Sequence, residues 1–411
     1  YTYRAQIAQI LTYHGVQIPR KYDWEDQAVI NWLLNNEKTR WVEHMTLPDM
    51  TATNQALLEN IFTMMVCILN RIPIFAIGKP GNSKSLALRI LNSNLRGPDS
   101  EKELWRNYPR VYVISYQGSE VSTSEGITKV FERARTYKNS IANDALVLVH
   151  FDEIGLAEAS PNNPLKVLHA HLEPGYPKDR PDYAVVGLSN FPLDAAKMNR
   201  AIALVRPPPP KEDLVKTAKA ICQGTQIARE DGLLKVLAEQ YNMYYQNQPV
   251  ADFHGLRDFY ALVKTLAYTY RHSPQQRNAA VYRAIARNFG GLKPKSSTST
   301  SQTFYGTSNV RHCHFWEMQG RFLGIKYDPN MQMDVVEMLE ENLRDKNGRH
   351  LMLVCSGEVN VPLTLVQTAA QKEGRSVQIM MGSTFAEDQS DHYSFGLLKR
   401  VVLSMERGDI L

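Results

Sequence analysis

The chain has few cysteines and no long apolar run. Its four cysteines in 411 residues are widely spaced and form no C-x-x-C pair: Cys67, Cys222, Cys313 and Cys355. Scattered cysteines of this kind are typical of reduced thiols, so we expect an intracellular, cytoplasmic protein without a disulfide framework. No stretch approaches the roughly 18 uninterrupted apolar residues that a membrane-spanning helix needs, so no transmembrane segment is expected.

The chain also lacks a strong charge of one sign. It has 47 Lys and Arg against 42 Asp and Glu, a formal net charge of +5. No run of basic residues is interleaved with aromatics, so nucleic acid is not an expected partner. The one cluster with metal-ligand chemistry is His312-Cys313-His314. Adjacent side chains in an extended chain point in opposite directions, so we interpret this cluster as structural.

A glycine-containing loop lies between an apolar strand, 72–77, and a helix that begins near residue 86. Its sequence is Gly78-Lys79-Pro80-Gly81-Asn82-Ser83-Lys84-Ser85. A loop of this kind, closing on Lys-Ser, is typical of a P-loop that binds ATP. Its backbone N–H groups and the helix N-terminus face an anion. Lys84 would then reach the β- and γ-phosphates, and the Ser85 hydroxyl would bind Mg²⁺.

The loop departs from the usual pattern at Ser83, where glycine normally stands before the lysine. Glycine allows the backbone to approach phosphate closely, and serine is a small residue that could replace it. The alternative is a strand–helix turn that binds nothing. The segments that follow favour nucleotide binding.

A second apolar strand, 145–151, ends on an acidic pair, Asp152-Glu153. A nearly continuous apolar run predicts a strand buried on both faces of a parallel sheet. Acids at the carboxyl end of such a strand lie where ligands collect. Asp152 is the expected Mg²⁺ ligand together with Ser85, and Glu153 the expected general base for the attacking water.

Polar and basic residues follow in a suggestive order. A strand over 183–188 ends at Asn190, which is placed to orient water. Arg200 and Arg206 come next, and Arg257 opens an amphipathic helix. Each of these arginines alone is more often a surface ion-pair residue. Their order after the phosphate loop and the acids makes them candidates for contacts to the γ-phosphate.

The rhythm of strands and helices predicts an α/β fold with a three-layer parallel sheet. The expected strands are 72–77, 110–115, 145–151, 183–188 and 201–205. Four prolines at 207–210 form a stiff hinge. The predicted domains are a helical segment over 1–50 ending a preceding module, a large α/β subdomain over 51–206, a helical lid over 207–292, a linker over 293–335 and a partial α/β module over 336–411.

The last predicted module lacks a phosphate loop. An expected strand over 351–355 is followed by Ser356-Gly357-Glu358 and no Lys-Ser or Lys-Thr pair. Further strands are expected over 377–383 and, from a strand-like apolar run, over 397–405. We therefore expect half of a degenerate neighbouring unit, one ATP per chain, and a chain that is a piece of a larger protein.

The order of phosphate loop, Asp-Glu, strand-end Asn, Arg and lid Gly-x-Arg resembles an AAA+ ATPase module over about residues 50–290. The match extends to segments that are unusual among AAA+ proteins. Together they resemble an ATP-binding module of the mysterin-type giant ring-finger E3 ubiquitin ligases, in the segments 78–85, 151–158, 164–169, 188–190, 196–200 and 254–258.

The resemblance implies roles for the candidate residues. Catalytic residues would be Asp152, Glu153, Asn190 and Arg200, with Arg257 sensing the γ-phosphate from the lid. Arg200 would be the finger that reaches an adjacent unit, with Arg206 as the other candidate. Implied partners are neighbouring AAA+ modules of the same polypeptide and the ubiquitin machinery.

Three functions stay open at this point. The first is an ATP-hydrolysing module of a ubiquitin ligase. The second is a nucleotide-gated structural module with little hydrolysis, which Ser83 favours and Glu153 disfavours. The third is a remodelling ATPase of the dynein or MoxR kind with no connection to ubiquitin.

Overall fold

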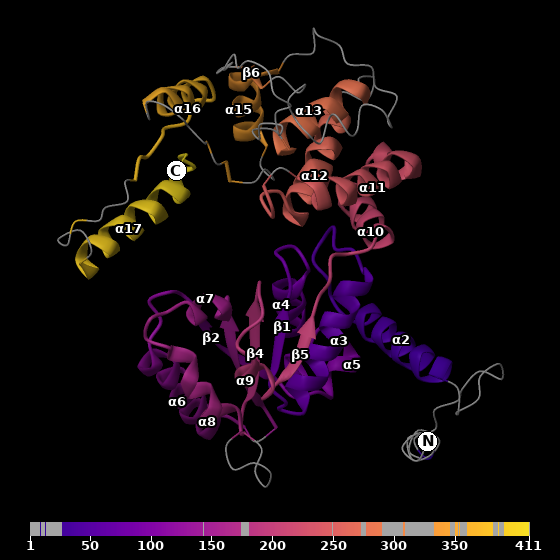
Figure 1. Cartoon of the computed structure of the whole chain (residues 1–411), viewed down its shortest axis with the longest axis vertical. Coiled ribbons are helices and arrows are strands. Elements are labelled where there is room, and N and C mark those ends of the chain that lie inside the picture. Colours follow the sequence, from indigo (N-terminus) through magenta and orange to yellow (C-terminus); the bar gives the residue numbers. More distant parts are fainter. Residues whose placement is uncertain are drawn as a thin grey trace. The chain divides into compact units, whose positions relative to one another are not determined.

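The computed structural model describes residues 27–142, 144–173, 181–248, 250–272 and 277–289, then mainly 333–345, 360–380 and 390–410. The chain divides into two units, Tyr1–Ala220 and Ile221–Leu411, which we call unit 1 and unit 2. Figure 1 shows the elements of each. The domain boundaries expected from the sequence remain predictions.

Unit 1 contains a five-stranded sheet in the order β2-β3-β4-β1-β5. Its strands are β1 Ile74–Ile77, β2 Val111–Gln117, β3 Leu146–Asp152, β4 Ala184–Ser189 and β5 Ile202–Val205. Every neighbouring pair is parallel. This confirms the predicted parallel α/β sheet, and each strand lies within a few residues of its expected position.

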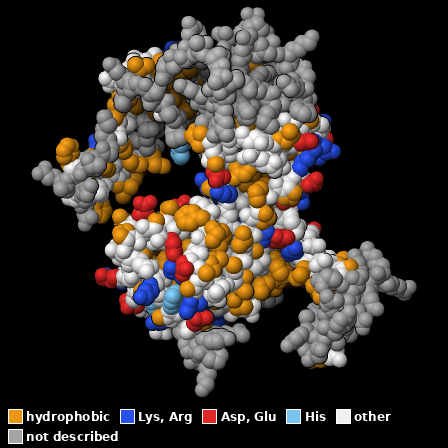
Figure 2. Space-filling view, viewed as in Figure 1, with side chains coloured by type: hydrophobic (Ala, Val, Ile, Leu, Met, Phe, Trp, Pro, Cys, Tyr) orange, Lys and Arg blue, Asp and Glu red, His pale blue; other side chains and the backbone are white. Residues whose placement is uncertain are grey.

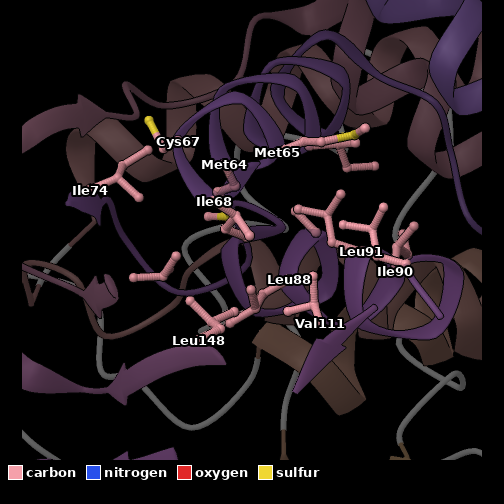
Figure 3. Packing of buried hydrophobic residues seen from close by; sticks show 14 of the residues in the cluster. Met64, Met65, Cys67, Ile68, Ile74, Leu88, Ile90, Leu91, Val111 and Leu148 are labelled. Carbon is pink, nitrogen blue, oxygen red and sulfur yellow. The ribbon is translucent and has the colours of Figure 1, made fainter. Parts of the chain in front are cut away.

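Side chains that alternate along the strands fill two separate cores, one on each face of the sheet. Ile74 and Ala76 of β1 pack in one cluster with helices α3 Gln55–Leu69 and α4 Lys84–Asn94. Figure 3 shows this cluster, with Met64 and Ile68 of α3 close to Leu88 of α4. Phe75 and Ile77 belong to the opposite cluster. The period of two in a strand therefore produces the three layers.

The second face of the sheet is covered by α6 Ser124–Ser140, α7 Ile154–Glu158 and α8 Leu168–Leu172. The remaining helices of unit 1 are α2 Gln27–Glu43, α5 Glu103–Arg106, α9 Ala195–Met198 and α10 Lys211–Ile221. In Figure 2, charged side chains of both signs are interspersed with apolar areas on the surface of this unit.

The start of α3 corrects a prediction. The sequence of 53–70 predicts a helix capped by Thr51 or Thr53. Asn54 is the N-cap instead, and its side-chain oxygen accepts a hydrogen bond from the Leu57 N–H at 2.9 Å. Asparagine is among the strongest N-cap residues because its short side chain reaches the second or third helical N–H. The Asn54 amide also donates to the Thr217 hydroxyl of α10.

Unit 2 contains three helices where the sequence predicts them, α11 Asp231–Asn247, α12 Leu256–His272 and α13 Arg277–Phe289. That they form a lid remains a prediction. Buried aromatic rings hold them together. Tyr241 packs against Phe259 with ring centroids 5.0 Å apart, and Tyr244 meets Phe289 edge-on at 5.5 Å. Aromatic pairs at such distances add to the burial of their large apolar surfaces.

Three further helices follow in unit 2: α15 Val335–Arg344, α16 Asn360–Lys372 and α17 Asp391–Arg407. Arg287 of α13 forms a buried ion pair with Asp345 at 3.1 Å. The expected strand over 397–405 is wrong, because these residues belong to α17, which is capped by Ser390. Its apolar residues recur at a helical spacing, and the sequence interpretation mistook their density for a strand.

Other expectations for this region are only partly tested. Val377 forms a single parallel bridge with Ile410, and 378–380 are not a strand. A two-stranded antiparallel pair, β6 Thr307–Ser308 and β7 Met333–Asp334, falls within the predicted linker. Four expectations lie wholly or largely outside the described residues: the first half of the helical segment over 1–50, most of the linker over 293–335, the 312–314 cluster and the 351–355 strand with its following loop.

The described residues carry no cluster of His, Cys, Asp and Glu suited to a metal, and no helix among them is long and apolar enough to cross a membrane. Cys67 and Cys222 are buried and free. Burial raises the pKa of the Cys67 thiol to about 11 and that of Cys222 to about 12. Both side chains are therefore neutral thiols at physiological pH, unsuited to nucleophilic chemistry.

Gly187 provides a test of this packing. A Cβ at Gly187 would lie 2.5 Å from Cδ1 of Phe75, a fully buried ring. We predict that Gly187→Ala lowers the free energy of unfolding by about 1–3 kcal/mol, as overpacking of a core does. Denaturant unfolding measures this. Gly232→Ala is the control, because its Cβ would meet no atom within 4 Å. Equal effects at the two positions would contradict the packing of β4 on β1.

Candidate nucleotide-binding site

The phosphate loop leaves β1 at the carboxyl edge of the sheet. The Gly78 N–H donates to the Ser189 carbonyl of β4 at 3.1 Å, and the Arg206 N–H donates to the Ile77 carbonyl at 2.7 Å. A Cβ at Gly78 would lie 2.8 Å from the Cβ of Arg206, so only glycine fits there. The loop is thus held on both sides before it turns.

Two residues of the loop have left-handed backbone conformations. Gly81 has φ +95°, which glycine adopts freely. Ser83 has φ +57° and ψ +17°, although it is not glycine, and it caps α4 without a side-chain hydrogen bond. A left-handed residue other than glycine costs about 1–2 kcal/mol. The geometry explains why glycine usually stands at this position, and it shows that serine still forms the turn.

Lys84 is the first residue of α4, and its side chain folds back over the loop. It is 7% exposed. Its ammonium donates to the Gly78 carbonyl, to the Lys79 carbonyl at 3.2 Å and to Oδ1 of Asn190 at 3.4 Å. The structure therefore brings Lys84 and Asn190 together, although 106 residues separate them. The following residue, Ser85, is exposed at the helix N-terminus.

The acidic pair leaves β3 at the same edge. Oδ1 of Asp152 accepts the Glu153 N–H at 3.1 Å. Glu153 is exposed, has a left-handed backbone with φ +49°, and accepts a hydrogen bond from Nε2 of Gln117 at 3.2 Å. Gln117 is the last residue of β2. The sequence interpretation missed Gln117, because nothing in the sequence indicates that β2 and β3 are neighbours in register.

A close backbone contact supports the turn at Glu153. The Gly118 N–H donates to the Asp152 carbonyl at 2.8 Å. A Cβ at Gly118 would lie 2.6 Å from the Glu153 carbonyl oxygen. Only glycine allows the end of β2 to lie this close, so Gly118 helps to fix the direction of the Glu153 side chain.

Arg206 follows β5 and lies beside Gly78, but its side chain points into the unit. It is paired with Glu59 of α3, and Lys38 of α2 lies 3.8 Å from the same carboxylate. Burial alone would raise the pKa of Glu59. Hydrogen bonds from Arg206 and Gln55 and the two positive charges outweigh burial and lower that pKa. Arg206 is thus engaged within its own unit.

Arg200 lies near the amino ends of the strands, at the opposite end of the sheet from the P-loop. It precedes β5, whose first N–H, at Ile202, donates to the Pro73 carbonyl just before β1. The P-loop follows β1, so the length of a strand separates it from Arg200. Arg200 forms an ion pair with Glu173 at 3.0 Å and donates to the Ala196 carbonyl. It therefore does not serve the P-loop of its own chain.

Arg257 lies in unit 2, at the second position of α12, and is exposed. The segment before it is anchored, because Nδ1 of the buried His254 is hydrogen-bonded to the Tyr244 hydroxyl at 2.6 Å. The Asp258 carboxylate accepts the Gly255 N–H at 2.7 Å. Arg257 thus projects from a well-packed helix start, and its role toward nucleotide remains a prediction.

The loop has the features that a triphosphate with Mg²⁺ requires. Asn82 belongs to the loop, and its Nδ2 is buried and has no hydrogen-bond partner within the described parts of the chain. The loop thus offers a donor and a lysine ammonium at the N-terminus of an eleven-residue helix, which suits an anion. Ser85 and Asp152 supply the oxygen ligands that Mg²⁺ prefers.

These features together define a P-loop module of the AAA+ class. A parallel sheet in the order β2-β3-β4-β1-β5 places a phosphate loop, an Asp-Glu pair and a strand-end Asn at one edge. Two family models, each described as an RNF213 AAA domain, match residues 50–213 and 340–411. The chain is an AAA+ region of the RNF213 type.

Sequence relatives agree over nearly the whole chain. E3 ubiquitin-protein ligase RNF213 of Homo sapiens is 31% identical over 425 residues, which covers 100% of this chain and 8% of that protein. E3 ubiquitin-protein ligase rnf213-beta of Danio rerio is 34% identical over 396 residues, covering 92% of this chain and 7% of that protein. The chain thus spans less than a tenth of the length of these relatives.

Solved structures that match the chain are of low identity. A point mutant of Thermotoga maritima RuvB is 12% identical with a TM-score of 0.36, covering 78% of this chain and 95% of that chain. C. elegans PCH-2 is 15% identical with a TM-score of 0.33, covering 60% of this chain and 69% of that chain. Neither similarity bears on what this chain does.

The strained turn at Ser83 gives a direct prediction. Ser83→Gly relieves the left-handed conformation, partly offset by the greater freedom of glycine in the unfolded chain, for a net gain of up to about 1 kcal/mol. We expect a higher melting temperature by differential scanning fluorimetry. The control is Ser93→Gly within α4, which should lose about 0.5 kcal/mol because glycine is a poorer helix former than serine. A loss of stability in both variants would contradict the left-handed geometry.

The Glu59 carboxylate gives a pH-dependent prediction. Its pKa is lowered in the folded state, so its contribution is present above the ordinary value of 4.5 and is lost as pH falls through the lowered pKa. We expect Glu59→Gln to cost about 1 kcal/mol at pH 7, since the pair is partly exposed. Urea unfolding at a series of pH values from neutral to acid measures the difference between wild type and variant.

That difference should shrink toward zero at the acid end of the series. Glu103→Gln is the control, because Glu103 is exposed on α5 and forms no ion pair within the described residues. A Glu59→Gln effect that stayed constant across the pH range would show that shape, and not charge, is what the residue contributes.

Proposed function

We propose that unit 1 binds MgATP at the P-loop and hydrolyses it, as the nucleotide-driven module of an RNF213-type E3 ubiquitin ligase. The main support is that Lys84, Asn190 and Glu153 all lie at the carboxyl ends of the strands, where Lys84 contacts Asn190 and Gln117 holds Glu153. A phosphate-binding cation alone would support binding. An exposed carboxylate held at the same edge supports hydrolysis as well.

In this proposal each residue of the site has a separate task. The backbone of residues 78–83 and the Lys84 ammonium bind the phosphates, and Lys84 exchanges its loop carbonyls for phosphate oxygens. Ser85 and Asp152 hold Mg²⁺, which neutralises charge on the phosphates. Asn190 orients the attacking water, and Arg257 reads the γ-phosphate from unit 2.

Glu153 takes a proton from the attacking water as its oxygen bonds to the γ-phosphorus, and the bond from that phosphorus to the β–γ bridging oxygen breaks to release ADP and phosphate. Gln117 donates to the Glu153 carboxylate and so positions it. Gln117 is thus a positioning residue for the base.

Arg200 is proposed as the finger that acts on an adjacent AAA+ unit. Arg200 lies at the end of the sheet opposite to the P-loop, which supports a role on a neighbouring unit. Arg206 is a weaker candidate, because it is paired with Glu59 of its own unit. The ion pair of Arg200 with Glu173 would have to open first. Neighbouring modules and the ubiquitin machinery are the proposed partners, and the cytoplasm the proposed location.

A nucleotide-gated structural module is the second candidate. Two observations favour it: Ser83 is strained in the loop, and Arg200 is neutralised by Glu173. Such a module would hold ATP and turn it over very slowly. The degenerate sequence of the last module supports a single ATP per chain in either case.

Lys84 tests nucleotide binding. Removal of its ammonium takes away a charge-assisted contact worth about 1.5–3 kcal/mol, so Lys84→Ala should weaken ATP binding by at least ~10-fold. Isothermal calorimetry with MgATP measures the dissociation constant. Arg89→Ala, an exposed cation on the same helix, should bind as wild type does. Equal affinity of all three proteins would refute the P-loop assignment.

Glu153 separates hydrolysis from binding. Glu153→Gln keeps size and hydrogen bonding but cannot accept the proton, so single-turnover hydrolysis should slow by ~100-fold or more while ATP affinity stays within about threefold. Glu120→Gln, an exposed acid of the neighbouring loop, is the control. An unchanged rate in Glu153→Gln would remove Glu153 from the chemistry. A wild-type rate as slow as that of the variant would support the structural module instead.

A further inference from the structure

The two outermost strands of the sheet, β5 and β2, differ in how well they are protected from pairing with a further strand. The edge strand β5 has only four residues and runs into Pro207–Pro210, which cannot donate hydrogen bonds. The other edge strand, β2, has seven residues, Val-Tyr-Val-Ile-Ser-Tyr-Gln, with no charge, proline or glycine. Exposed edge strands of proteins normally contain charged residues or proline, because an edge strand without them pairs readily with other strands.

The backbone of β2 offers free hydrogen-bonding groups. The Arg110 carbonyl accepts from Leu146 of the β3 side, and the Gly118 N–H donates toward Asp152 of β3. Even-numbered residues of β2 therefore direct their N–H and C=O groups to β3. Odd-numbered residues direct theirs outward, since the direction alternates along a strand.

The first outward group is already used, because the Val111 N–H donates to the Leu95 carbonyl at 3.0 Å. Arg96 bridges Arg110 antiparallel just before it. Beyond this point no backbone hydrogen bond of Val113 or Ser115 to the outer side is formed by the part of the chain that the structure describes. Ser115 is exposed and Val113 half-buried.

A groove runs along this edge. It has a volume of about 740 Å³ and is lined by three consecutive residues of β2, Tyr112, Val113 and Ile114. Consecutive strand side chains point to opposite faces, so a groove that touches all three lies along the strand's edge. Its other wall is one face of α6, at helical spacing: Lys129, Glu132, Arg133, Thr136, Tyr137 and Ser140.

The groove is partly apolar and has a small excess of positive charge. A second hollow of about 370 Å³ shares Tyr112 and is lined by Arg96 and Arg110. The two linings together contain four basic side chains, Arg96, Arg110, Lys129 and Arg133, and one acid, Glu132. Two of these bases are already paired, Arg110 with Asp99 and Lys129 with Glu125, which leaves Arg96 and Arg133 for a ligand. Tyr112 and Tyr137 meet edge-on, with ring centroids 5.4 Å apart, and form an apolar floor.

We propose that the β2 edge and α6 form a docking groove for an extended, acidic peptide segment of a partner protein, which adds to the sheet as a sixth strand. A free strand edge flanked by a helix is the arrangement by which an added strand gains affinity from backbone hydrogen bonds and specificity from alternate side chains. Here alternate apolar residues would pack on Tyr112 and Tyr137, and acidic residues would meet Arg133 and Arg96, which form no ion pair within the described residues.

Peptide binding to the whole chain tests the proposal. The probe is a fluorescein-labelled, acetylated peptide of four Glu-Val repeats, titrated by fluorescence anisotropy. Two comparison peptides are the Lys-Val analogue and the Glu-Val peptide with N-methylated valines, which cannot pair as a strand. We expect micromolar binding of the Glu-Val peptide, at least tenfold weaker binding of both comparison peptides, and slower hydrogen exchange in residues 111–117 on binding.

Two variants locate the site. Ser115→Pro removes an outward N–H, keeps the backbone hydrogen bonds to β3, and should weaken binding at least tenfold. It also removes the hydrogen bond between the Ser115 hydroxyl and Nδ1 of His150 in β3, so Ser115→Ala, which loses only that bond, is its control and should bind as wild type does. Arg133→Glu, on α6, leaves the sheet unaltered and should weaken it at least threefold. The control Arg89→Glu reverses an exposed charge on α4, outside either hollow, and should bind as wild type does.

The proposal is overturned by three results. One is no Glu-Val binding at millimolar peptide. Another is binding that neither Ser115→Pro nor Arg133→Glu weakens. The third is a dimer in sedimentation velocity that Ser115→Pro converts to monomer, which would show that a second copy of the chain occupies the edge. Because ATP is absent from all of these titrations, their failure leaves the proposed nucleotide site unaffected.

Discussion

The site depends on one constraint: β1 is hydrogen-bonded in parallel on both sides, between β4 and β5. Its end is held by Gly78 to Ser189 on one side and by Arg206 to Ile77 on the other. Because all five strands are parallel, their carboxyl ends meet at one edge. That places the loop after β1, the acids after β3 and Asn190 after β4 together, although they are far apart in the sequence.

The candidate site is organised before any ligand arrives. Lys84 is held by two loop carbonyls, Glu153 by Gln117, and Arg206 by Glu59. Charges whose positions are fixed in advance need less reorganisation when a charged ligand binds. The turn into α4 requires a strained left-handed backbone at Ser83. The packing of β1 and α4 on either side of the turn holds the backbone in that conformation. The site therefore combines a rigid scaffold with a locally strained loop.

Much of this could be predicted from the sequence. Continuous apolar runs identified all five strands, and the loop with its Lys-Ser ending located the P-loop, because both signals are local. Three features could not be. The pairing of Gln117 with Glu153 depends on strand order and register. The cap of α3 is Asn54 and not Thr51 or Thr53, since all three are capable N-cap residues and only the backbone decides which one precedes the first helical turn. The 397–405 run is helical in α17, since a short apolar run cannot by itself distinguish helix from strand.

We propose that this chain contains one nucleotide site, formed by the loop after β1. The most direct test is a calorimetric titration of the whole chain with MgATP, with hydrogen exchange of residues 78–85 measured at saturation. We predict a stoichiometry of one and slower hydrogen exchange across the loop and the first turn of α4. Absence of binding, a second site of similar affinity, or saturation that leaves exchange in 78–85 unaltered would contradict this proposal.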